Sequence, residues 1–354
     1  MSCSEGTDGI VYEGLLDFEK TEVDLDKLPK INTKILINIA SPEGAFHWWH
    51  LPVHGIGLAR MEFIINNIIK VHPMALVHFD TLKNKKTKRL IETLTEQYTD
   101  KKQYFVDNLA MSLAKIASAC YPNNAIVRMS DFKTNEYANL IGGDEFEFAE
   151  ENPMLGFRGA SRYYNKRYRE GFALECQAIK KAREVLGLDN IIVMIPFCRT
   201  VQEADKVLKE MENNGLKRKE NNLQVYVMAE IPSNIILAKD FAKRFDGFSI
   251  GSNDLTQLTL GIDRDSEELA SIFDENNEAV RISIKNLIKD AHEKNVKVGI
   301  CGQAPSDKED FAEFLVENKI DTISLNPDSV IKIITFLDKI EKKIISNKTD
   351  IKSA

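Results

Sequence analysis

Charged or reactive side chains stand at the ends of several short apolar runs of this sequence. Arg60 ends GIGLAR, Arg128 lies near the end of AIVRMS, Glu230 follows VYVMA, Asp254 follows GFSIGSN, and Cys301 ends VKVGIC. An apolar core rejects such groups unless they are paired. Their repeated position after apolar runs therefore indicates one shared site with acid, base and ion-binding chemistry.

The arginines predict an anion site. Arg60 and Arg128 are the basic residues of their apolar runs, and Arg158 and Arg162 follow in GFRGASR, where the glycines permit close approach of a ligand. Guanidinium groups bind carboxylate and phosphate in a bidentate way, so arginines directed at one cavity predict a small dianionic ligand. The alternative is that each arginine pairs with a structural carboxylate, for instance Arg60 with Glu62.

The two carboxylates predict a metal site. Glu230 in VMAEIPSN and Asp254 in GSNDLTQ end consecutive apolar runs, so in a parallel sheet their oxygens would face one point. Mg²⁺ takes one or two protein carboxylates and completes its octahedron with substrate oxygens and water. Without a metal, such a pair would have to share a proton or find cationic partners.

The runs that carry these residues read as the strands of a parallel sheet. Eight short apolar runs, many of them rich in β-branched residues, alternate with longer segments of helical period. They are ILINIA, GIGLAR, AIVRMS, IIVMIPF, VYVMAEI, GFSIGSND, VKVGICG and TISLNPD. This alternation predicts an α/β fold, a (β/α)8 TIM-type barrel whose reactive groups lie at the C-terminal strand ends. A doubly wound open sheet is the alternative, but ILINIASPEG lacks the glycine-rich turn expected after its first strand.

Two segments are longer than one strand-helix unit needs. Residues 61–123 hold several helical patterns and predict a helical insertion after strand 2, and residues 131–170 form a long polar excursion after strand 3. We expect residues 31–345 to form the barrel, and residues 346–354 to form a flexible tail. Residues 1–30 look like the end of another, β-rich domain followed by a linker.

Composition excludes several classes of function. The 354 residues carry a net charge of −7, which argues against nucleic acid or an anionic membrane as the main partner. The five cysteines include no CxxC pair, and no apolar run approaches the ~20 residues that span a bilayer. The start lacks a signal peptide, so a cytoplasmic location is expected.

Several segments together resemble the phosphoenolpyruvate-utilising enzymes. They are GIGLARMEFI, VRMSDFKTNEYANLIGG, NPMLGFRGASRYY, VMIPFCRT, NLQVYVMAEIPSN, FDGFSIGSNDLTQLTLGIDRD and GICGQAPSD. The resemblance covers about residues 1–340, and LARMEF and SDFKTNEYANL are most similar to the phosphoenolpyruvate synthases (pyruvate, water dikinases) of this family. It implies a barrel that binds pyruvate and phosphoenolpyruvate.

The resemblance also implies roles for individual residues. Arg60 and Arg128 would bind the substrate's carboxylate or phosphoryl group, assisted by Arg158 and Arg264. Glu230 and Asp254 would hold Mg²⁺. The substrate would be lined by Gly251, Ser252 and Asn253. Cys301 would be the general acid/base at the methyl carbon, because a thiol ordinarily titrates nearer to neutrality than a carboxyl or an amine. Gly299 and Gly302 would leave room for substrate beside it.

In the family, an ATP-grasp domain and a swivelling domain with a phosphorylated histidine precede this barrel. The resemblance implies both as partners, on an upstream segment or a separate chain, and residues 1–30 would be a remnant of the swivelling domain. The chain is therefore expected to catalyse phosphoryl transfer between that phosphohistidine and pyruvate enolate. A homodimer is expected by analogy. The competing functions are a non-catalytic phosphoenolpyruvate sensor and a Mg²⁺-dependent enolate lyase or aldolase.

Overall fold

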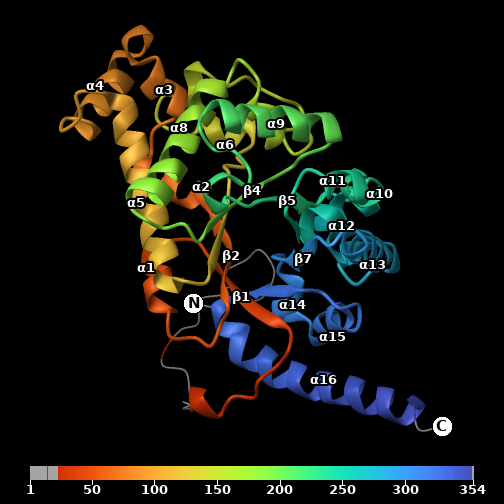
Figure 1. Cartoon of the computed structure of the whole chain (residues 1–354). Coiled ribbons are helices and arrows are strands. Elements are labelled where there is room, and N and C mark those ends of the chain that lie inside the picture. Colours follow the sequence, from red (N-terminus) through yellow and green to blue (C-terminus); the bar gives the residue numbers. More distant parts are fainter. Residues whose placement is uncertain (1–13, 15–22, 353–354) are drawn as a thin grey trace.

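The computed structural model describes residue 14 and residues 23–352. Eight parallel strands, each hydrogen-bonded to its sequence neighbours, close into a barrel in which β1 also pairs with β8 (Figure 1). The strands are β1 (Lys34–Ile39), β2 (Gly55–Arg60), β3 (Asn124–Arg128), β4 (Ile191–Ile195), β5 (Val225–Ala229), β6 (Gly247–Ile250), β7 (Lys297–Ile300) and β8 (Thr322–Leu325). The predicted barrel and its eight strands are confirmed, and the open sheet is excluded.

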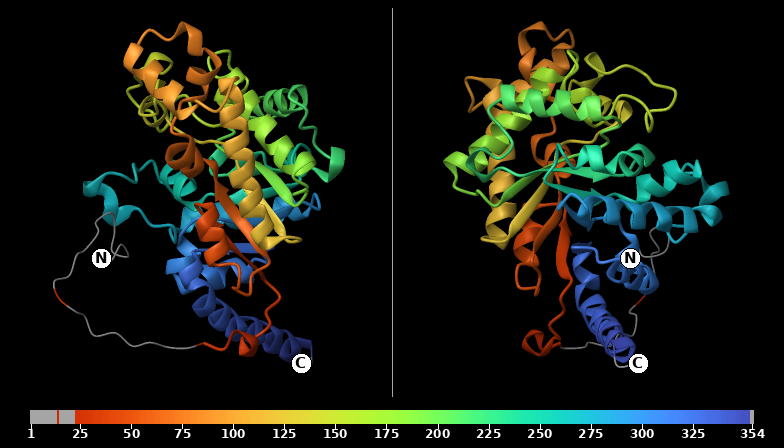
Figure 2. Two further views of the ribbon diagram at one scale, coloured as in Figure 1. Left: turned by 90° about the vertical axis from the view of Figure 1, so that its left-hand side faces the viewer. Right: turned by 45° about the vertical axis from the view of Figure 1, so that its right-hand side comes forward.

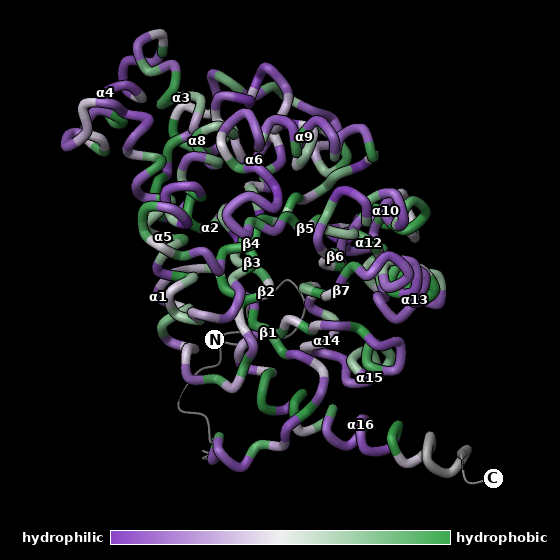
Figure 3. Tube along the Cα trace, in the orientation of Figure 1, coloured by the Kyte–Doolittle hydropathy of each residue, from purple (hydrophilic) through white to green (hydrophobic). Residues whose placement is uncertain are grey.

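The strands form because their residues can be buried on both faces. Every residue of β4 and of β5 is buried, as expected for parallel strands covered by helices. Outward side chains pack against the surrounding helices in one large core. Inward side chains make a smaller cluster inside the barrel, which consists of Leu36, Leu58, Ile126, Ile192, Met194, Tyr226, Met228 and Cys301. Figure 3 shows the strands as mostly hydrophobic and α4 (Lys85–Leu94) as mostly hydrophilic.

Helices connect and cover the strands. The remaining α-helices are α1 (Pro42–His47), α2 (Met61–Ile64), α3 (Pro73–Val77), α5 (Lys101–Cys120), α6 (Thr134–Ala138), α7 (Ala160–Tyr163), α8 (Arg169–Lys180), α9 (Val201–Asn213), α10 (Pro232–Ile236), α11 (Ala238–Phe241), α12 (Ser252–Leu260), α13 (Glu278–His292), α14 (Ala304–Asp307), α15 (Glu309–Glu317) and α16 (Val330–Lys352). Short 3₁₀ segments are Leu25–Lys27, Phe79–Thr81, Gly143–Glu145, Glu220–Asn222, Glu267–Ile272 and Pro327–Ser329, and π-helical segments are Ile65–Ile69 and Lys181–Val185.

Side-chain caps fix where several helices begin. The Thr200 hydroxyl accepts a hydrogen bond from the Glu203 backbone N–H at the start of α9, and Asp100 caps α5 in the same way. Ser41 caps α1, which has Pro42 at its first position. Such caps satisfy backbone N–H groups that the helix itself leaves free. They hold the loops that follow β1 and β4 in fixed positions.

The predicted helical insertion after strand 2 is confirmed. Between β2 and β3 the chain forms α2, α3, α4 and the long α5, which returns along the barrel toward β3. Figure 1 and both views of Figure 2 place α3 and α4 together, away from the closed sheet and at the far end of the molecule from α16. The insertion therefore stands beside the loops that follow the strands.

The two ends of the chain are described only in part. Most of residues 1–30 lie outside the described residues, so their assignment to another domain stays a prediction. Glu341 of α16 accepts hydrogen bonds from the backbone N–H groups of Asn32 and Thr33 and so ties the entry to β1 to the last helix. That helix runs to Lys352, within the predicted flexible tail. In the described part of the chain, no helix is long and apolar enough to cross a membrane.

Candidate active site

A cavity of about 660 Å³ opens at the C-terminal ends of the strands. Nine of the ten predicted site residues line it, namely Arg60, Arg128, Arg158, Glu230, Gly251, Asn253, Asp254, Arg264 and Cys301. They come from the ends of β2, β3, β5, β6 and β7 and from the loops between them. The barrel thus gathers residues that are up to 241 positions apart along the chain, from Arg60 to Cys301.

Of the four arginines that line the cavity, Arg60 has no carboxylate partner among the described residues. Among the described residues, no carboxylate lies within ion-pair distance of its guanidinium, which lies 5.8 Å from the ring centroid of Phe63. Desolvation by the surrounding protein, and then the positive charge of Arg128, lower the pKa of Arg60 below its usual value. The predicted alternative, an ion pair between Arg60 and Glu62, is wrong, because Glu62 binds Arg128 instead.

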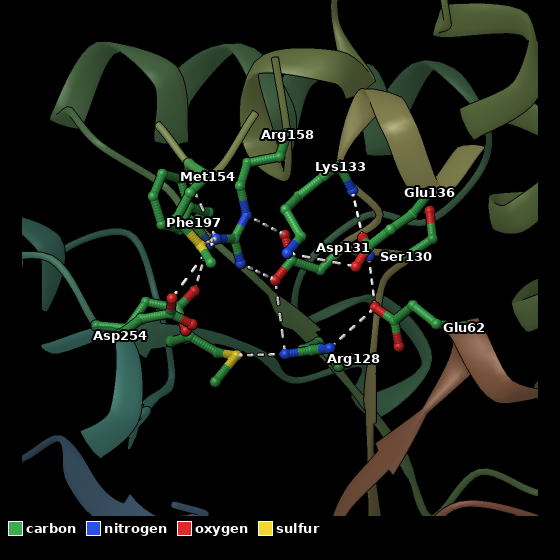
Figure 4. Close-up of polar contacts among 12 residues, drawn as sticks. Glu62, Arg128, Ser130, Asp131, Lys133, Glu136, Met154, Arg158, Phe197 and Asp254 are labelled. Atoms are coloured by element: carbon green, nitrogen blue, oxygen red, sulfur yellow. Dashed lines mark hydrogen bonds and ion pairs between the residues drawn. The ribbon is translucent and has the colours of Figure 1, made fainter. Parts of the chain in front are cut away.

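Arg128 is held between two carboxylates. Its Nη2 donates to Glu62 Oε1 at 3.0 Å, and its Nη1 lies 3.6 Å from Asp131 Oδ2 (Figure 4). Burial opposes the charge of this guanidinium, but the carboxylates of Glu62, Asp131 and Glu230 outweigh it and raise the pKa of Arg128. The side chain is therefore permanently charged and fixed, while its Nε has no hydrogen-bond partner among the described residues.

Arg158 is fixed by Asp131 in a bidentate ion pair. Its Nε and Nη2 donate to the two Asp131 oxygens at 3.1 and 2.6 Å, and Figure 4 shows the guanidinium between Asp131 and Asp254. Its Nη1 contacts Met154 Sδ at 3.1 Å and lies 3.5 Å from Asp254 Oδ1. Arg128 and Arg158 therefore both pair with carboxylates of the protein, as the alternative interpretation of the sequence expected. Both arginines nevertheless line the cavity as well.

Glu230, which follows β5, and Asp254, in the first turn of α12 after β6, line the same cavity. Glu230 Oε1 accepts the backbone N–H of Phe197 at 2.7 Å, while Glu230 Oε2 and Asp254 Oδ1 are buried and accept no hydrogen bond from a described residue. Burial, and then the negative charges of Asp254 and Asp131, raise the pKa of Glu230 above its ordinary value. Arg264 Nη1 lies 3.9 Å from Asp254 Oδ2.

These two oxygens fit a hard divalent cation. Both are buried carboxylate oxygens at the edge of one cavity that accept no hydrogen bond from a described residue, and carboxylate oxygen is the protein ligand that Mg²⁺ prefers. The Asp254 oxygen has the guanidinium of Arg158 at 3.5 Å as an ion-pair partner. Gly251 leaves room for the Glu230 carboxylate, since a Cβ at this position would lie 2.7 Å from Glu230 Oε2. The described residues hold no cluster of three or more His, Cys, Asp or Glu side chains arranged around a metal, so substrate and water would have to complete the coordination.

Cys301 lies at the top of the barrel interior. It is 4% exposed, belongs to the inner apolar cluster and lines the cavity floor, and its Sγ lies 3.7 Å from the backbone oxygen of Ile250. Burial raises the pKa of the Cys301 thiol, while a contact with Ser249 and the charge of Arg128 lower it again in part. At neutral pH the thiol therefore carries its proton.

Three residues lie elsewhere than predicted from the sequence. Ser252 is fully buried, does not line the cavity, and donates its hydroxyl to Glu275. Arg162 is also buried, and its guanidinium binds Glu147 at 2.8 and 2.6 Å, so this arginine pairs with a structural carboxylate. Gly299 does not line the cavity, and a Cβ on it would collide with Thr322. Gly302 does line the cavity beside Cys301, and a Cβ on it would collide with Ser252.

Two carboxylates orient the arginines: Asp131 was not predicted from the sequence, and Glu62 was considered there only as a partner of Arg60. Asp131 binds Arg158 and lies near Arg128, and its own backbone N–H donates to Glu62. Both residues stand within the segments VRMSDF and LARMEF, three and two positions after an arginine that ends a strand. An acidic residue two or three positions after an arginine at a strand end was the sequence pattern that could have indicated these carboxylates.

Comparisons with known proteins agree with this geometry. Residues 19–342 match the family described as PEP-utilising enzyme, PEP-binding domain. The chain belongs to this family. Its relatives include phosphoenolpyruvate synthases from a Synechocystis species (56% identical over 97% of this chain), Aquifex aeolicus (52% over 97%) and Escherichia coli (47% over 97%). The predicted family is thereby confirmed.

This member of the PEP-utilising family spans less than half the length of those relatives. The aligned regions cover 42%, 45% and 43% of the Synechocystis, Aquifex and Escherichia coli proteins. The PEP-binding domain accounts for nearly all of the chain described above, and its match begins at residue 19 and ends within α16.

Proposed function

We propose that this barrel binds pyruvate and phosphoenolpyruvate and catalyses Mg²⁺-dependent phosphoryl transfer between a phosphohistidine on another domain and the enolate of pyruvate. In the complete reaction, ATP, pyruvate and water would give AMP, phosphoenolpyruvate and phosphate. The observation that carries the proposal is the guanidinium of Arg60, which has no carboxylate partner among the described residues. It shares one cavity with the thiol of Cys301 and with two carboxylate oxygens, of Glu230 and Asp254, that accept no hydrogen bond from a described residue.

The arginines would bind the anionic groups of the substrate. Arg60 has no carboxylate within ion-pair distance among the described residues, so an anionic ligand would supply its missing partner. Arg128 and Arg158 are already oriented by Glu62 and Asp131, and a preoriented donor loses little freedom when it binds a ligand. Arg264, which is a third exposed, lies where it can reach a phosphoryl group at the mouth.

Glu230 and Asp254 would hold Mg²⁺, which would supply positive charge against the negative charge that develops on the keto oxygen when pyruvate loses a methyl proton. Asn253 and Gly251 would border the substrate beside these carboxylates. Magnesium as the cofactor, and these two residues as its ligands, are part of the proposal.

Cys301 would move the proton at the methyl carbon. When phosphoenolpyruvate is made, its thiolate takes a methyl proton, and the bond from phosphorus to the histidine nitrogen breaks as the enolate oxygen bonds to phosphorus. In the reverse direction the thiol returns the proton to carbon, and the raised pKa of Cys301 supports this donor role. A phosphoenolpyruvate sensor would need no such group.

Hydrogen exchange tests this assignment. With Mg²⁺, the chain should exchange the methyl hydrogens of pyruvate with D₂O, at a rate that rises with pH because the thiolate is the base. The Cys301→Ala variant should lose this exchange by about 10²- to 10⁴-fold, the usual contribution of a general acid/base. Proton NMR of pyruvate, corrected for the protein-free rate, measures both.

Calorimetric titration with pyruvate and Mg²⁺ is the control for that variant. Binding should persist in Cys301→Ala, because the arginines and carboxylates that hold the ligand are unchanged. Equal exchange by the wild type and the variant would remove Cys301 from the mechanism, and a wild type that binds pyruvate without any exchange would favour the sensor.

A further inference from the structure

Phe197 has an unusual backbone conformation next to the site. It follows β4 in the segment PFCRT, is 2% exposed, and has a φ of 46°. A side chain other than glycine adopts this region at an energetic cost, which persists only where the surrounding structure enforces it. The conformation directs the Phe197 N–H at Glu230 Oε1, which it reaches at 2.7 Å.

Two guanidinium groups lie over the ring of Phe197. The Cζ of Arg158 is 4.0 Å from the ring centroid, and the Cζ of Arg199 is 4.7 Å from it. Figure 4 shows Phe197 beside Arg158 and near Asp254. A cation over the face of a buried ring is attracted by the ring quadrupole, so Phe197 fixes the position of Arg158 without neutralising its charge.

The loop that carries Arg158 is fitted to this ring. Gly159 has a φ of 55°, and a Cβ on it would lie 2.6 Å from the Phe197 Cβ. Arg199 donates to the backbone oxygens of Leu155, Gly156 and Arg158. The loop is thus held on one side by Arg199 and on the other by close contact with Phe197.

We propose that Phe197 is a positioning residue that aligns the substrate-binding and metal-binding halves of the site, its ring by placing Arg158 and its backbone N–H by orienting Glu230. The inference rests on the proposed function, because it gives Arg158 a ligand and Glu230 a metal. A phenylalanine with a packing role alone would need neither the strained φ nor two guanidinium groups over its ring.

Substitution of the side chain separates the two contributions. Phe197→Leu removes the ring but keeps the N–H, so affinity for phosphoenolpyruvate with Mg²⁺ should fall by about 5- to 30-fold, the range expected for a buried cation–π contact. Affinity for Mn²⁺ alone should stay within about twofold. Calorimetry measures the first affinity and electron paramagnetic resonance of free Mn²⁺ the second. Phe197→Met, which fills the space with an unbranched chain, should likewise weaken phosphoenolpyruvate binding and leave Mn²⁺ affinity unchanged.

Phe241→Leu is the matched control. Phe241 is equally buried, in α11, and contacts Phe245, with no guanidinium over its ring among the described residues. This variant should lower the melting temperature and leave phosphoenolpyruvate affinity unchanged.

The outcomes distinguish this inference from the proposed function. Phosphoenolpyruvate binding that is lost in Arg60→Met but unchanged in both Phe197 variants would overturn the positioning role and leave the function standing. An equal loss of affinity in Phe197→Leu and Phe241→Leu would reduce Phe197 to a structural residue. A wild type that binds no phosphoenolpyruvate would overturn both.

Discussion

At the scale of single residues, the nearest carboxylate decides what each arginine does. Arg162 is buried and bound to Glu147, and its guanidinium lies 4.5 Å from the ring centroids of both Tyr137 and Phe157. Arg60 is exposed at the cavity mouth and has no carboxylate partner among the described residues. The same side chain therefore stabilises the fold at position 162 and, under the proposed function, would bind the ligand at position 60.

Arg60→Met should weaken phosphoenolpyruvate binding by about tenfold or more, because a charge-assisted bond to the ligand is lost. The free energy of unfolding should change by no more than about 0.5 kcal/mol, since no ion pair within the described chain is broken. Calorimetry and urea denaturation measure the two effects.

Arg162→Met is the contrasting variant for that experiment. It leaves Glu147 buried without its partner, so it should cost about 3–5 kcal/mol of stability. If Arg60→Met destabilised the chain as strongly as this while binding stayed intact, Arg60 would be a structural residue.

For the carboxylate pair of Glu230 and Asp254, we expect substitutions to abolish ligand binding without unfolding the chain. Glu230→Gln and Asp254→Asn should each abolish Mg²⁺-dependent pyruvate binding and leave the fold intact, because each removes a negative charge from a buried pair. Calorimetry with pyruvate and Mg²⁺ measures the binding, and melting curves report the fold. Unchanged affinity in both variants would contradict the metal assignment.

At the scale of elements, a buried network joins α8 to the end of β3. Glu175 of α8 accepts hydrogen bonds from the Ser130 hydroxyl at 2.6 Å, the Ser130 backbone N–H at 3.2 Å and the Tyr168 hydroxyl at 2.7 Å. Tyr137 bonds to both Ser130 and Tyr168. Ser130 stands directly before Asp131, so this network supports the residue that orients Arg158.

This network should make stability depend on pH. Burial raises the pKa of Glu175 from 4.5 to about 7, with a smaller contribution from the negative charge of Glu62, while the hydrogen bonds from Ser130 and Tyr168 oppose the shift. A carboxyl whose pKa is higher in the folded state binds its proton more tightly there. Its stabilising contribution is complete below about pH 4.5 and is lost as the pH rises to about 7.

Between pH 5 and pH 8, wild-type stability should therefore fall by roughly 2–3 kcal/mol relative to Glu175→Gln, which has no proton to lose. Urea denaturation of both proteins at the two pH values gives this difference, and the comparison cancels contributions from other carboxyls. The same pH slope in both proteins would show that Glu175 keeps one ionisation state throughout.

At the scale of the whole molecule, the barrel would hold the acceptor side of the proposed phosphoryl transfer. No histidine lines the cavity of the described structure, and His72 is fully buried against Glu147. A phosphohistidine would therefore have to reach the cavity from a domain outside the barrel.

The purified chain should accordingly make no phosphoenolpyruvate from ATP and pyruvate. Thin-layer chromatography with ATP labelled in its β-phosphate measures the product, and the pyruvate exchange described above shows that the same preparation is active. Labelled phosphoenolpyruvate formed by this chain alone would contradict the need for a separate phosphohistidine domain.

Local sequence patterns were sufficient to predict the barrel and most of the site residues that line its cavity. Strand existence follows from local patterns of apolar residues, and parallel strands in a closed barrel put all C-terminal ends on one face. These patterns predict that Arg60, Glu230, Asp254 and Cys301 share one cavity, and the structure places all four there. The eight predicted strands needed only corrected ends.

The pairing of charged groups can be established only from the folded structure. Glu62 lies two positions from Arg60 but binds Arg128, which is 66 residues away, because β2 and β3 are adjacent and Glu62 lies in the first turn of the helix after β2. Arg162 lies four positions after Arg158, yet its guanidinium binds the buried Glu147. Pairing depends on the direction of each side chain after the barrel closes, and local sequence patterns carry no information about that direction.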